Sequence, residues 1–326
     1  MIFNSIQFYI FRLLGDDMKK RNKEKLIIII ILIISIIAFD RLTLLLVRKG
    51  NSYGTDVLNF YKQPRNSIDL IVLGSSHAYT SFNPYLVEEE TGLKTYDFCT
   101  QQQPLWITYY YLKEALKYQH PKYIVLESHM AVVGNYDYAE EQVNRDAIDK
   151  MRFSSNKVDT IKNSVENEED RMSYYLNIIK YHSRYKEVDV VDIKTAFFGY
   201  TIDNKGYITL EETGYVFDNT NELTNNEIEI YKKNIEYLNK IINLAKEENI
   251  KLIIVKTPTS YGQEDMARLN YVKRVANEND ILFLDYMNDM DDLNLDYSKD
   301  FYDAGHLNKN GSIKFTNKFT EIIKQM

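Results

Sequence analysis

The chain has 326 residues, of which 44% are hydrophobic, so one sizeable globular domain with additional segments is expected. Its net charge of −7 argues against a nucleic-acid-binding protein, because such proteins usually carry a basic face. The single cysteine, Cys99, excludes an intrachain disulfide framework and a cysteine-rich metal cluster. We expect Cys99 to be a small buried residue that follows a strand, with a nucleophilic role as the alternative.

The strongest local feature is the apolar run of residues 26–47. Its two uncharged parts, 26–39 and 42–47, together approach the ~20 residues that cross ~30 Å of hydrocarbon. Only Asp40 and Arg41 interrupt it, toward its C-terminal end, where they can pair or snorkel. Five basic residues precede the run: Lys19, Lys20, Arg21, Lys23 and Lys25. The positive-inside rule therefore predicts a single-pass anchor in the cell membrane at residues 26–47, with residues 1–25 cytoplasmic and the chain from about residue 48 extracytoplasmic. No small-residue cleavage site follows the run, which favours an uncleaved anchor.

The first 17 residues differ from the usual start of such an anchor. From Met18 the sequence Met-Lys-Lys-Arg-Asn-Lys-Glu-Lys is typical of that start. The preceding Gly15-Asp16-Asp17 fits the translation of a ribosome-binding sequence upstream of Met18. We therefore predict that translation begins at Met18 and that residues 1–17 are a start-site artefact.

After a polar linker at residues 48–66, apolar runs and helical patterns alternate through residues 67–326. Short apolar runs bounded by turn residues predict buried strands at 68–73, 94–98, 122–127, 251–256 and 281–285. Helical periodicity and end signals predict helices at 83–92, 106–118, 227–249, 264–279 and 308–324. This alternation predicts an α/β fold, a three-layer flavodoxin-like parallel sheet with helices on both faces, preceded by one transmembrane helix.

Residues 134–226 break this alternation. They are rich in Tyr, Asn, Asp, Glu and Lys, and they contain short helical pieces such as residues 171–185. We predict that this stretch is an insertion or a lid over the strand ends.

Polar residues gather where the carboxyl ends of the strands are expected, which is the edge at which open parallel sheets bind ligands. Gly74-Ser75-Ser76-His77 follows the first strand, Glu127-Ser128-His129 follows the third, and Asp303-Ala304-Gly305-His306 precedes the last helix. Three of the five histidines, His77, His129 and His306, thus fall at this edge. An active site produces clustering of this kind.

A serine in a Gly-x-Ser turn after the first strand, with Asp-x-x-His before the last helix, resembles the SGNH (GDSL-like) serine esterases and acyltransferases. The resemblance spans roughly residues 67–324 and implies an SGNH-like fold with Ser76 as nucleophile, Ser75 replacing the usual Asp. It also implies His306 as the base and Asp303 as the carboxylate that orients it. The chemistry requires this set, because a serine hydroxyl is a poor nucleophile until a correctly held base removes its proton.

The chain departs from this family where oxyanion donors are usual. A Gly after the second strand and a Gly-x-Asn-Asp after the third are replaced by Asp-Phe-Cys-Thr-Gln-Gln-Gln-Pro at 97–104 and by Glu127-Ser128-His129. Candidate oxyanion or substrate residues are therefore Gly74, Ser75, His77, Thr100, Gln101, Gln102 and His129. The pattern is similar to a divergent branch that includes D-alanine transfer proteins and exopolysaccharide acetyltransferase-like proteins.

Structural alternatives exist for these residues. Ser75 and Ser76 can simply cap a helix, and His77 and His129 can be hydrogen-bonded structural residues. One functional alternative is a metal-dependent envelope hydrolase that uses His77, His129, His306 and Asp303 as ligands, although no His-x-His or His-Glu-x-x-His spacing supports it. Another is a non-catalytic glycan-binding or assembly protein on the same fold.

We predict a membrane-anchored serine O-acyl esterase or acyltransferase that modifies a cell-envelope polysaccharide or related polymer through an acyl-serine intermediate. No cofactor, metal or nucleic acid is expected. The expected partners are the envelope polymer or an acyl donor, the membrane, and, by resemblance alone, a multi-spanning membrane acyltransferase.

Overall fold

The computed structural model describes residues 20–47, 57–199, 203–219, 221–288 and 290–326. The chain divides into two compact units, of which the smaller combines the described parts of Met1–Val47 and Tyr181–Tyr200. The predicted start-site artefact at residues 1–17 lies outside the described residues, as do residues 48–56 of the predicted linker. The rest of that linker contains a short helix, α3 (Val57–Phe60), which buries Val57 and Phe60.

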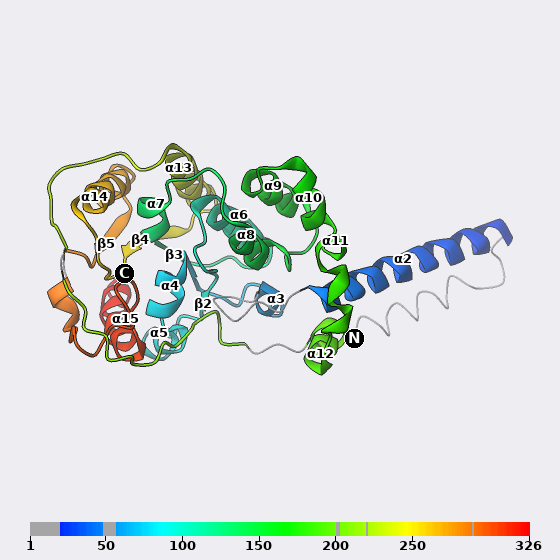
Figure 1. The fold of residues 1–326 in the computed structure, drawn as a ribbon, viewed down its shortest axis with the longest axis horizontal. Helices are drawn as coiled ribbons and strands as arrows, with labels where there is room; N and C mark the ends of the chain where they lie inside the picture. The colour runs from blue at the N-terminus through cyan, green and yellow to red at the C-terminus, as the bar shows by residue number, and fades with distance from the viewer. Residues whose placement is uncertain (1–19, 48–56, 200–202, 220, 289) are drawn as a thin grey trace. The chain divides into compact units, whose positions relative to one another are not determined.

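The larger unit is built around five parallel strands (Figure 1). They are β1 (Leu70–Leu73), β2 (Thr95–Asp97), β3 (Tyr123–Glu127), β4 (Lys251–Lys256) and β5 (Leu282–Asp285). Their order across the sheet is β2-β1-β3-β4-β5, which is the order of flavodoxin-like doubly wound sheets. The predicted α/β fold is therefore confirmed.

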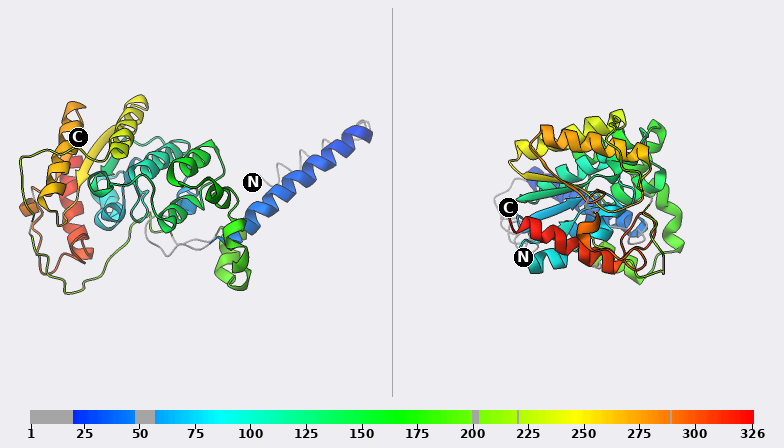
Figure 2. Two further views of the ribbon diagram at one scale, coloured as in Figure 1. Left: turned by 45° about the horizontal axis from the view of Figure 1, so that its top comes forward. Right: turned by 90° about the vertical axis from the view of Figure 1, so that its left-hand side faces the viewer.

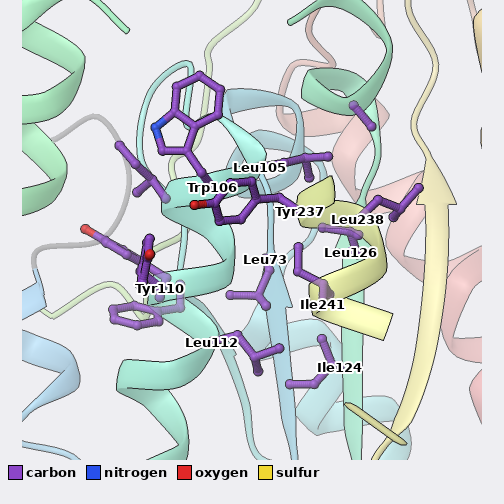
Figure 3. Packing of buried hydrophobic residues seen from close by; sticks show 14 of the residues in the cluster. Leu73, Leu105, Trp106, Tyr110, Leu112, Ile124, Leu126, Tyr237, Leu238 and Ile241 are labelled. Carbon is purple, nitrogen blue, oxygen red and sulfur yellow. The ribbon is translucent and has the colours of Figure 1, made fainter. Parts of the chain in front are cut away.

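Helices cover both faces of this sheet (Figure 2). One face is covered by α6 (Leu105–Leu116), α7 (His129–Val133), α13 (Lys232–Glu247) and α14 (Gln263–Glu278), the other by α4 (Ser76–Ser81), α5 (Pro84–Thr91) and α15 (Lys309–Ile323). Successive strand side chains point to opposite faces, so Ile71 and Leu73 join one core cluster while Leu70 and Val72 join the other. Figure 3 shows part of the first cluster, including Ile124 of β3.

The long helix α13 begins at Lys232, five residues after the predicted start at Glu227. The intervening residues bond to α14 instead. Glu227 pairs with Arg274, and the Ile228 N–H donates to the Ala267 carbonyl at 3.1 Å. These tertiary bonds outweigh the local helical pattern, which by itself is a weak determinant of structure.

The predicted insertion contains α8 (Glu141–Ile148), α9 (Ser155–Ser164), α10 (Glu168–Tyr175) and α11 (Ile178–Tyr181). Helix α9 packs against α6, where the Asn156 side-chain amide donates to the Tyr110 carbonyl and to Glu114. A later segment without regular structure bonds to α4 through Ile208 and to the start of α15 through Leu210. The idea that this stretch closes over the strand ends stays a prediction.

The smaller unit consists of α2 (Lys20–Leu46), the 3₁₀ helix η1 (His182–Lys186) and α12 (Val190–Phe198). Residues 22–46 of α2 form one helix that is long and apolar enough to cross a membrane. The Arg184 guanidinium donates to the carbonyls of Leu46 and Val47, and Arg41 donates to the carbonyl of Ala196. These bonds place residues 181–199, which the sequence pattern assigned to the globular domain, beside the apolar helix.

Candidate active site

The candidate residues lie at the carboxyl edge of the sheet, next to its three central strands, β1, β3 and β4. Leu73 of β1 pairs with Leu126 of β3, which in turn pairs with Ile254 of β4. The segments that follow these strands therefore start at nearly the same level. The order of the sheet reverses between β1 and β3, and such a switch point is where open α/β sheets bind their ligands.

Gly74 fixes the sharp turn that carries Ser76. Its φ of +152° lies outside the region that side chains favour, and a Cβ there would lie 2.9 Å from Ala78 Cβ and 3.0 Å from Glu127 Cβ. Helix α4 can therefore begin immediately after β1, with Ser76 as its first residue. The buried side chain of Ser75 makes no capping bond, and its Oγ has no hydrogen-bond partner among the described residues.

Ser76, His306 and Asp303 form a continuous hydrogen-bonded chain. Ser76 Oγ lies 2.8 Å from His306 Nε2, and His306 Nδ1 lies 2.9 Å and 3.1 Å from the two carboxylate oxygens of Asp303. Burial alone would raise the pKa of Asp303, but hydrogen bonds from His306 and from the Gly305 N–H lower it below its ordinary value. An ionised carboxylate only accepts hydrogen bonds, so Nδ1 carries the proton and Nε2 accepts from the serine hydroxyl.

The turn that carries His306 is held from three sides. Asp303 Oδ1 accepts the main-chain N–H groups of Gly305 and His306, which closes the turn. The Ser260 N–H, in the loop after β4, donates to the Ala304 carbonyl at 2.9 Å. Asn308 caps the N-terminus of α15 directly after the turn. The imidazole is thus positioned by main-chain bonds that do not depend on any substrate.

His77 and His129 lie beside this chain as a stacked pair. Their ring centroids are 3.6 Å apart, and the ring of His77 lies 4.8 Å from that of His306. His129 Nδ1 is 2.8 Å from the Tyr261 hydroxyl. Burial, together with the neighbouring positive charges, lowers the pKa of both His77 and His129 well below the ordinary histidine value. Both rings are therefore neutral near pH 7.

A buried ion pair supports the stacked histidines, and the sequence did not single it out. Lys256, at the end of β4, lies 3.1 Å from Glu127, at the end of β3, and both side chains are fully buried. Glu127 also accepts hydrogen bonds from the Thr257 hydroxyl and from the His129 N–H. Tyr261 is a second missed residue. The signal available for the Lys256–Glu127 pair was a lysine at the end of a buried strand, since lysine is rarely buried without a partner.

The other predicted oxyanion segment, Thr100–Gln102, forms a hydrogen bond within its own loop. The hydroxyl of the buried Thr100 donates to Gln103, while Gln101 and Gln102 are exposed. A role for these residues in the site stays a prediction. Cys99 is fully buried, and burial raises the pKa of its thiol well above the ordinary value, so the reactive thiolate is disfavoured.

Across the described residues, no group of three or more His, Cys, Asp or Glu side chains is arranged to hold a metal ion. His77 and His129 instead stack face to face, with ring centroids 3.6 Å apart. The metal-hydrolase alternative gains no ligand set from this arrangement.

No family model matches the chain, and no curated protein matches its sequence. Among solved structures, a proposed acylhydrolase from Bacteroides fragilis is 12% identical, with 82% of this chain and 92% of that one covered at a TM-score of 0.42. A proposed lipolytic protein of the G-D-S-L family from Desulfitobacterium hafniense is 9% identical (79% and 99% covered, TM-score 0.39). An acetyl xylan esterase is 13% identical (78% and 100% covered, TM-score 0.40). Likeness at this level assigns neither activity nor substrate to the chain.

Proposed function

We propose that this chain is a serine O-acyl esterase or acyltransferase that works through an acyl-serine intermediate. The observation that carries the proposal is the unbroken hydrogen-bonded chain from Ser76 Oγ through His306 to Asp303. A serine becomes nucleophilic when a base within hydrogen-bond reach takes its proton and a third group orients that base. Each of these requirements is met by a different residue of the chain.

In the first half-reaction, Ser76 Oγ attacks the carbonyl carbon of an ester as its proton passes to His306 Nε2. Asp303 stabilises the imidazolium that forms. The tetrahedral intermediate then expels the alcohol, which takes the proton from His306 and leaves an acyl-serine. In the second half-reaction, water or a sugar hydroxyl gives its proton to His306 and attacks the acyl-serine. The tetrahedral intermediate then expels Ser76 Oγ, which takes the proton back from His306, and the acyl group leaves on the new acceptor.

The negative oxygen of each tetrahedral intermediate needs hydrogen-bond donors. The main-chain N–H groups of the first turn of a helix have no intrahelical partner, and Ser76 opens α4. We assign the first donor to this turn. The Thr100–Gln102 segment is the candidate for a second donor. It follows Phe98, whose main-chain N–H donates to the carbonyl of Val72 in β1, so the segment starts close to the end of β1.

The apolar helix α2 supports a membrane location. Most of its large apolar side chains between Ile27 and Phe39 are more than half exposed, and an apolar surface of that extent is normally covered by lipid or protein. We propose a single-pass anchor with a cytoplasmic N-terminus and an extracytoplasmic catalytic domain. A tethered enzyme on that side meets envelope polymers, so an acylated polysaccharide or related polymer is the proposed substrate. A multi-spanning acyltransferase that supplies acyl groups is the proposed partner.

The test is covalent labelling of the full-length chain in detergent micelles with a fluorophosphonate, which traps activated serines whatever acyl group the enzyme prefers. Mass spectrometry should find the adduct on Ser76, and His306→Ala should abolish it. Ser75→Ala is the matched control, because it removes the neighbouring hydroxyl of the same turn and should label normally. An unlabelled wild-type chain that is folded, or equal labelling in His306→Ala, would leave the binding-protein alternative as the better account.

A further inference from the structure

Helix α12 exposes an apolar face. Val190 is 64% exposed and Phe198 is 81% exposed, and the other exposed apolar side chains of this nine-residue helix are Val191, Ile193 and Phe197. These five positions gather on one side of an α-helix, because residues three, four and seven apart share a face. The residues buried on the other side are Asp192 and Ala196. Exposure of such an apolar face to water is unfavourable, so we expect lipid or protein to cover it.

The other side of α12 packs against the C-terminal part of α2. Arg41 of α2 donates to the carbonyl of Ala196, which belongs to the last turn of α12, where carbonyls lack intrahelical partners. Arg184 binds the end of α2 at the Leu46 and Val47 carbonyls and also lies 3.5 Å from Asp192 of α12. The two helices are thus joined within one compact unit at a defined level of α2.

The length of α2 determines how deep in the membrane its contacts with α12 would lie. The uncharged part from Leu26 to Phe39 is 14 residues, or about 21 Å at 1.5 Å per residue. This is short of the ~30 Å of a hydrocarbon core. Leu26 to Val47 is 22 residues, or about 33 Å, which suffices. A full crossing therefore includes the turns beside α12, and Arg41 then lies about 9 Å from the end of the span, six residues before Val47.

A charge at that depth needs partners. Arg41 has two, the Asp40 carboxylate at 2.7 Å and the Ala196 carbonyl at 3.0 Å. The second comes from α12. The carboxyl end of a helix carries a partial negative charge, which favours a cation there. Helix α12 thus supplies a hydrogen-bond acceptor to an arginine in the membrane, and it presents an apolar face on its other side.

We propose that α12 is an interfacial membrane helix, with its apolar face embedded among the lipids of the leaflet that holds the C-terminal end of α2 and its last turn capping Arg41. Interfacial helices bury their apolar faces about 5–10 Å below the surface, which agrees with the level of Arg41. The inference rests on the proposed anchoring of α2 and is independent of the esterase chemistry. It makes α12 (Val190–Phe198) a second membrane contact of the chain.

Spin labels attached to single cysteines in the full-length chain, reconstituted in phosphatidylethanolamine–phosphatidylglycerol nanodiscs, test the proposal. Labels are placed at Phe198→Cys and Val190→Cys, with Ile33→Cys as a reference in α2 and Ser183→Cys as the matched exposed control in the same unit. The native Cys99 is fully buried, so it stays unlabelled in the folded chain. Each variant must retain the wild-type fluorescence of the buried Trp106, which reports on folding of the globular unit without depending on the Ser76 chemistry.

We expect the Phe198 and Val190 labels to behave like the Ile33 label, relaxed by lipid-soluble oxygen and shielded from a water-soluble nickel chelate. The Ser183 label should show the reverse. Nickel access at Phe198 equal to that at Ser183 would place α12 in water and overturn the proposal. Shielding of Phe198 from both reagents would also overturn it, since protein would then cover the face. Nickel access at Ile33 would overturn the anchor itself and leave the Ser76 chemistry intact.

Discussion

At the scale of single residues, the site depends on two short turns that lie 230 positions apart in the chain. In each turn, a local constraint on the main chain fixes the position of one reacting side chain, Ser76 or His306. Gly74 permits the close approach to Ala78 and Glu127 that brings Ser76 to the sheet edge. Asp303 closes its own turn through two main-chain N–H groups and so presents His306. Both constraints involve residues next to the reacting groups, which is why short motifs could indicate them.

Replacing Asp303 by Asn should reduce kcat far more than it changes KM. The amide preserves the shape but removes the charge that holds the imidazole tautomer and stabilises the imidazolium. We expect a loss of about 10⁴-fold in kcat, the size seen when the orienting carboxylate of such a triad is replaced by an amide. Steady-state hydrolysis of p-nitrophenyl acetate measures it. Asp291→Asn, an exposed position, is the control, and a similar kcat in both variants would remove Asp303 from the mechanism.

The stacked histidines should make stability depend on pH. In the folded chain burial lowers the pKa of His77 and His129 well below the ordinary value, whereas in the unfolded chain it is about 6.5. Below about pH 6.5 the unfolded state therefore binds protons that the folded state excludes. The free energy of unfolding should fall with decreasing pH, by about 1.4 kcal/mol per pH unit for each histidine, until the folded-state pKa is reached.

The variant His77→Phe keeps an aromatic ring on His129 but cannot be protonated. It should flatten the pH dependence by about one proton's slope, and His129→Phe should do the same. Urea titrations between pH 7 and pH 5, followed by the fluorescence of Trp106, measure this, because Trp106 is the only tryptophan and is fully buried. If both variants keep the wild-type slope, the histidines are not the groups that titrate.

Ser76, His306 and Asp303 were identified through the resemblance of their two short motifs to the SGNH family, and the structure brings these three side chains together. Tyr261 and Lys256 were not identified. Neither belongs to a short motif. Their place in the site follows from the pairing of β3 with β4, which puts Lys256 next to Glu127 and the loop after β4 next to His129. Such contacts depend on strand order, which the local pattern does not encode.

At the scale of secondary structure, the alternation of strands and helices was predictable because each element has a strong local signal. Helix α5, for example, starts after Asn83, whose side chain accepts two main-chain N–H groups, and ends at Gly92 in the left-handed region. The start of α13 was wrong because Glu227 and Ile228 bond to α14 instead. Element ends that are set by a neighbouring element are therefore the ones that a single sequence leaves undetermined.

The buried pair that joins β3 to β4 should be sensitive to the loss of one partner. Lys256→Met leaves the Glu127 carboxylate buried without its cation, and we expect a loss of about 3–5 kcal/mol in the free energy of unfolding. Adding Glu127→Gln to Lys256→Met should recover part of this loss, because the uncompensated charge is then removed. The urea titration followed by Trp106 fluorescence measures both variants.

The exposed pair between Lys122 and Asp69 supplies the matched control for that prediction. Its Nζ–Oδ1 distance of 3.0 Å is similar to that of the buried pair, but 67% of the Lys122 side chain is exposed. Lys122→Met should therefore change the free energy of unfolding by less than about 1 kcal/mol. A loss as large as that of Lys256→Met would mean that burial does not determine the effect.

At the scale of the whole molecule, the chain separates an apolar, membrane-compatible unit from a unit that carries the candidate site. The apolar helix was evident from composition alone. The association of residues 181–199 with it was not, because it depends on Arg41 and Arg184 bonding to main-chain carbonyls more than 130 residues away. Main-chain carbonyls occur at every residue, so no sequence pattern marks the ones that an arginine will select.

The proposed topology predicts opposite labelling of the two ends of the chain in intact cells. Asn22 precedes the apolar part of α2, and Asn317 is an exposed residue of α15 in the globular unit. A membrane-impermeant maleimide should label Asn317→Cys in intact cells, but Asn22→Cys only after the membrane is permeabilised. The buried Cys99 should remain unlabelled in both variants and so provides an internal control. The reverse pattern would place the Ser76 site in the cytoplasm, where an envelope polymer cannot reach it, and the substrate proposal would fail even if Ser76 is a nucleophile.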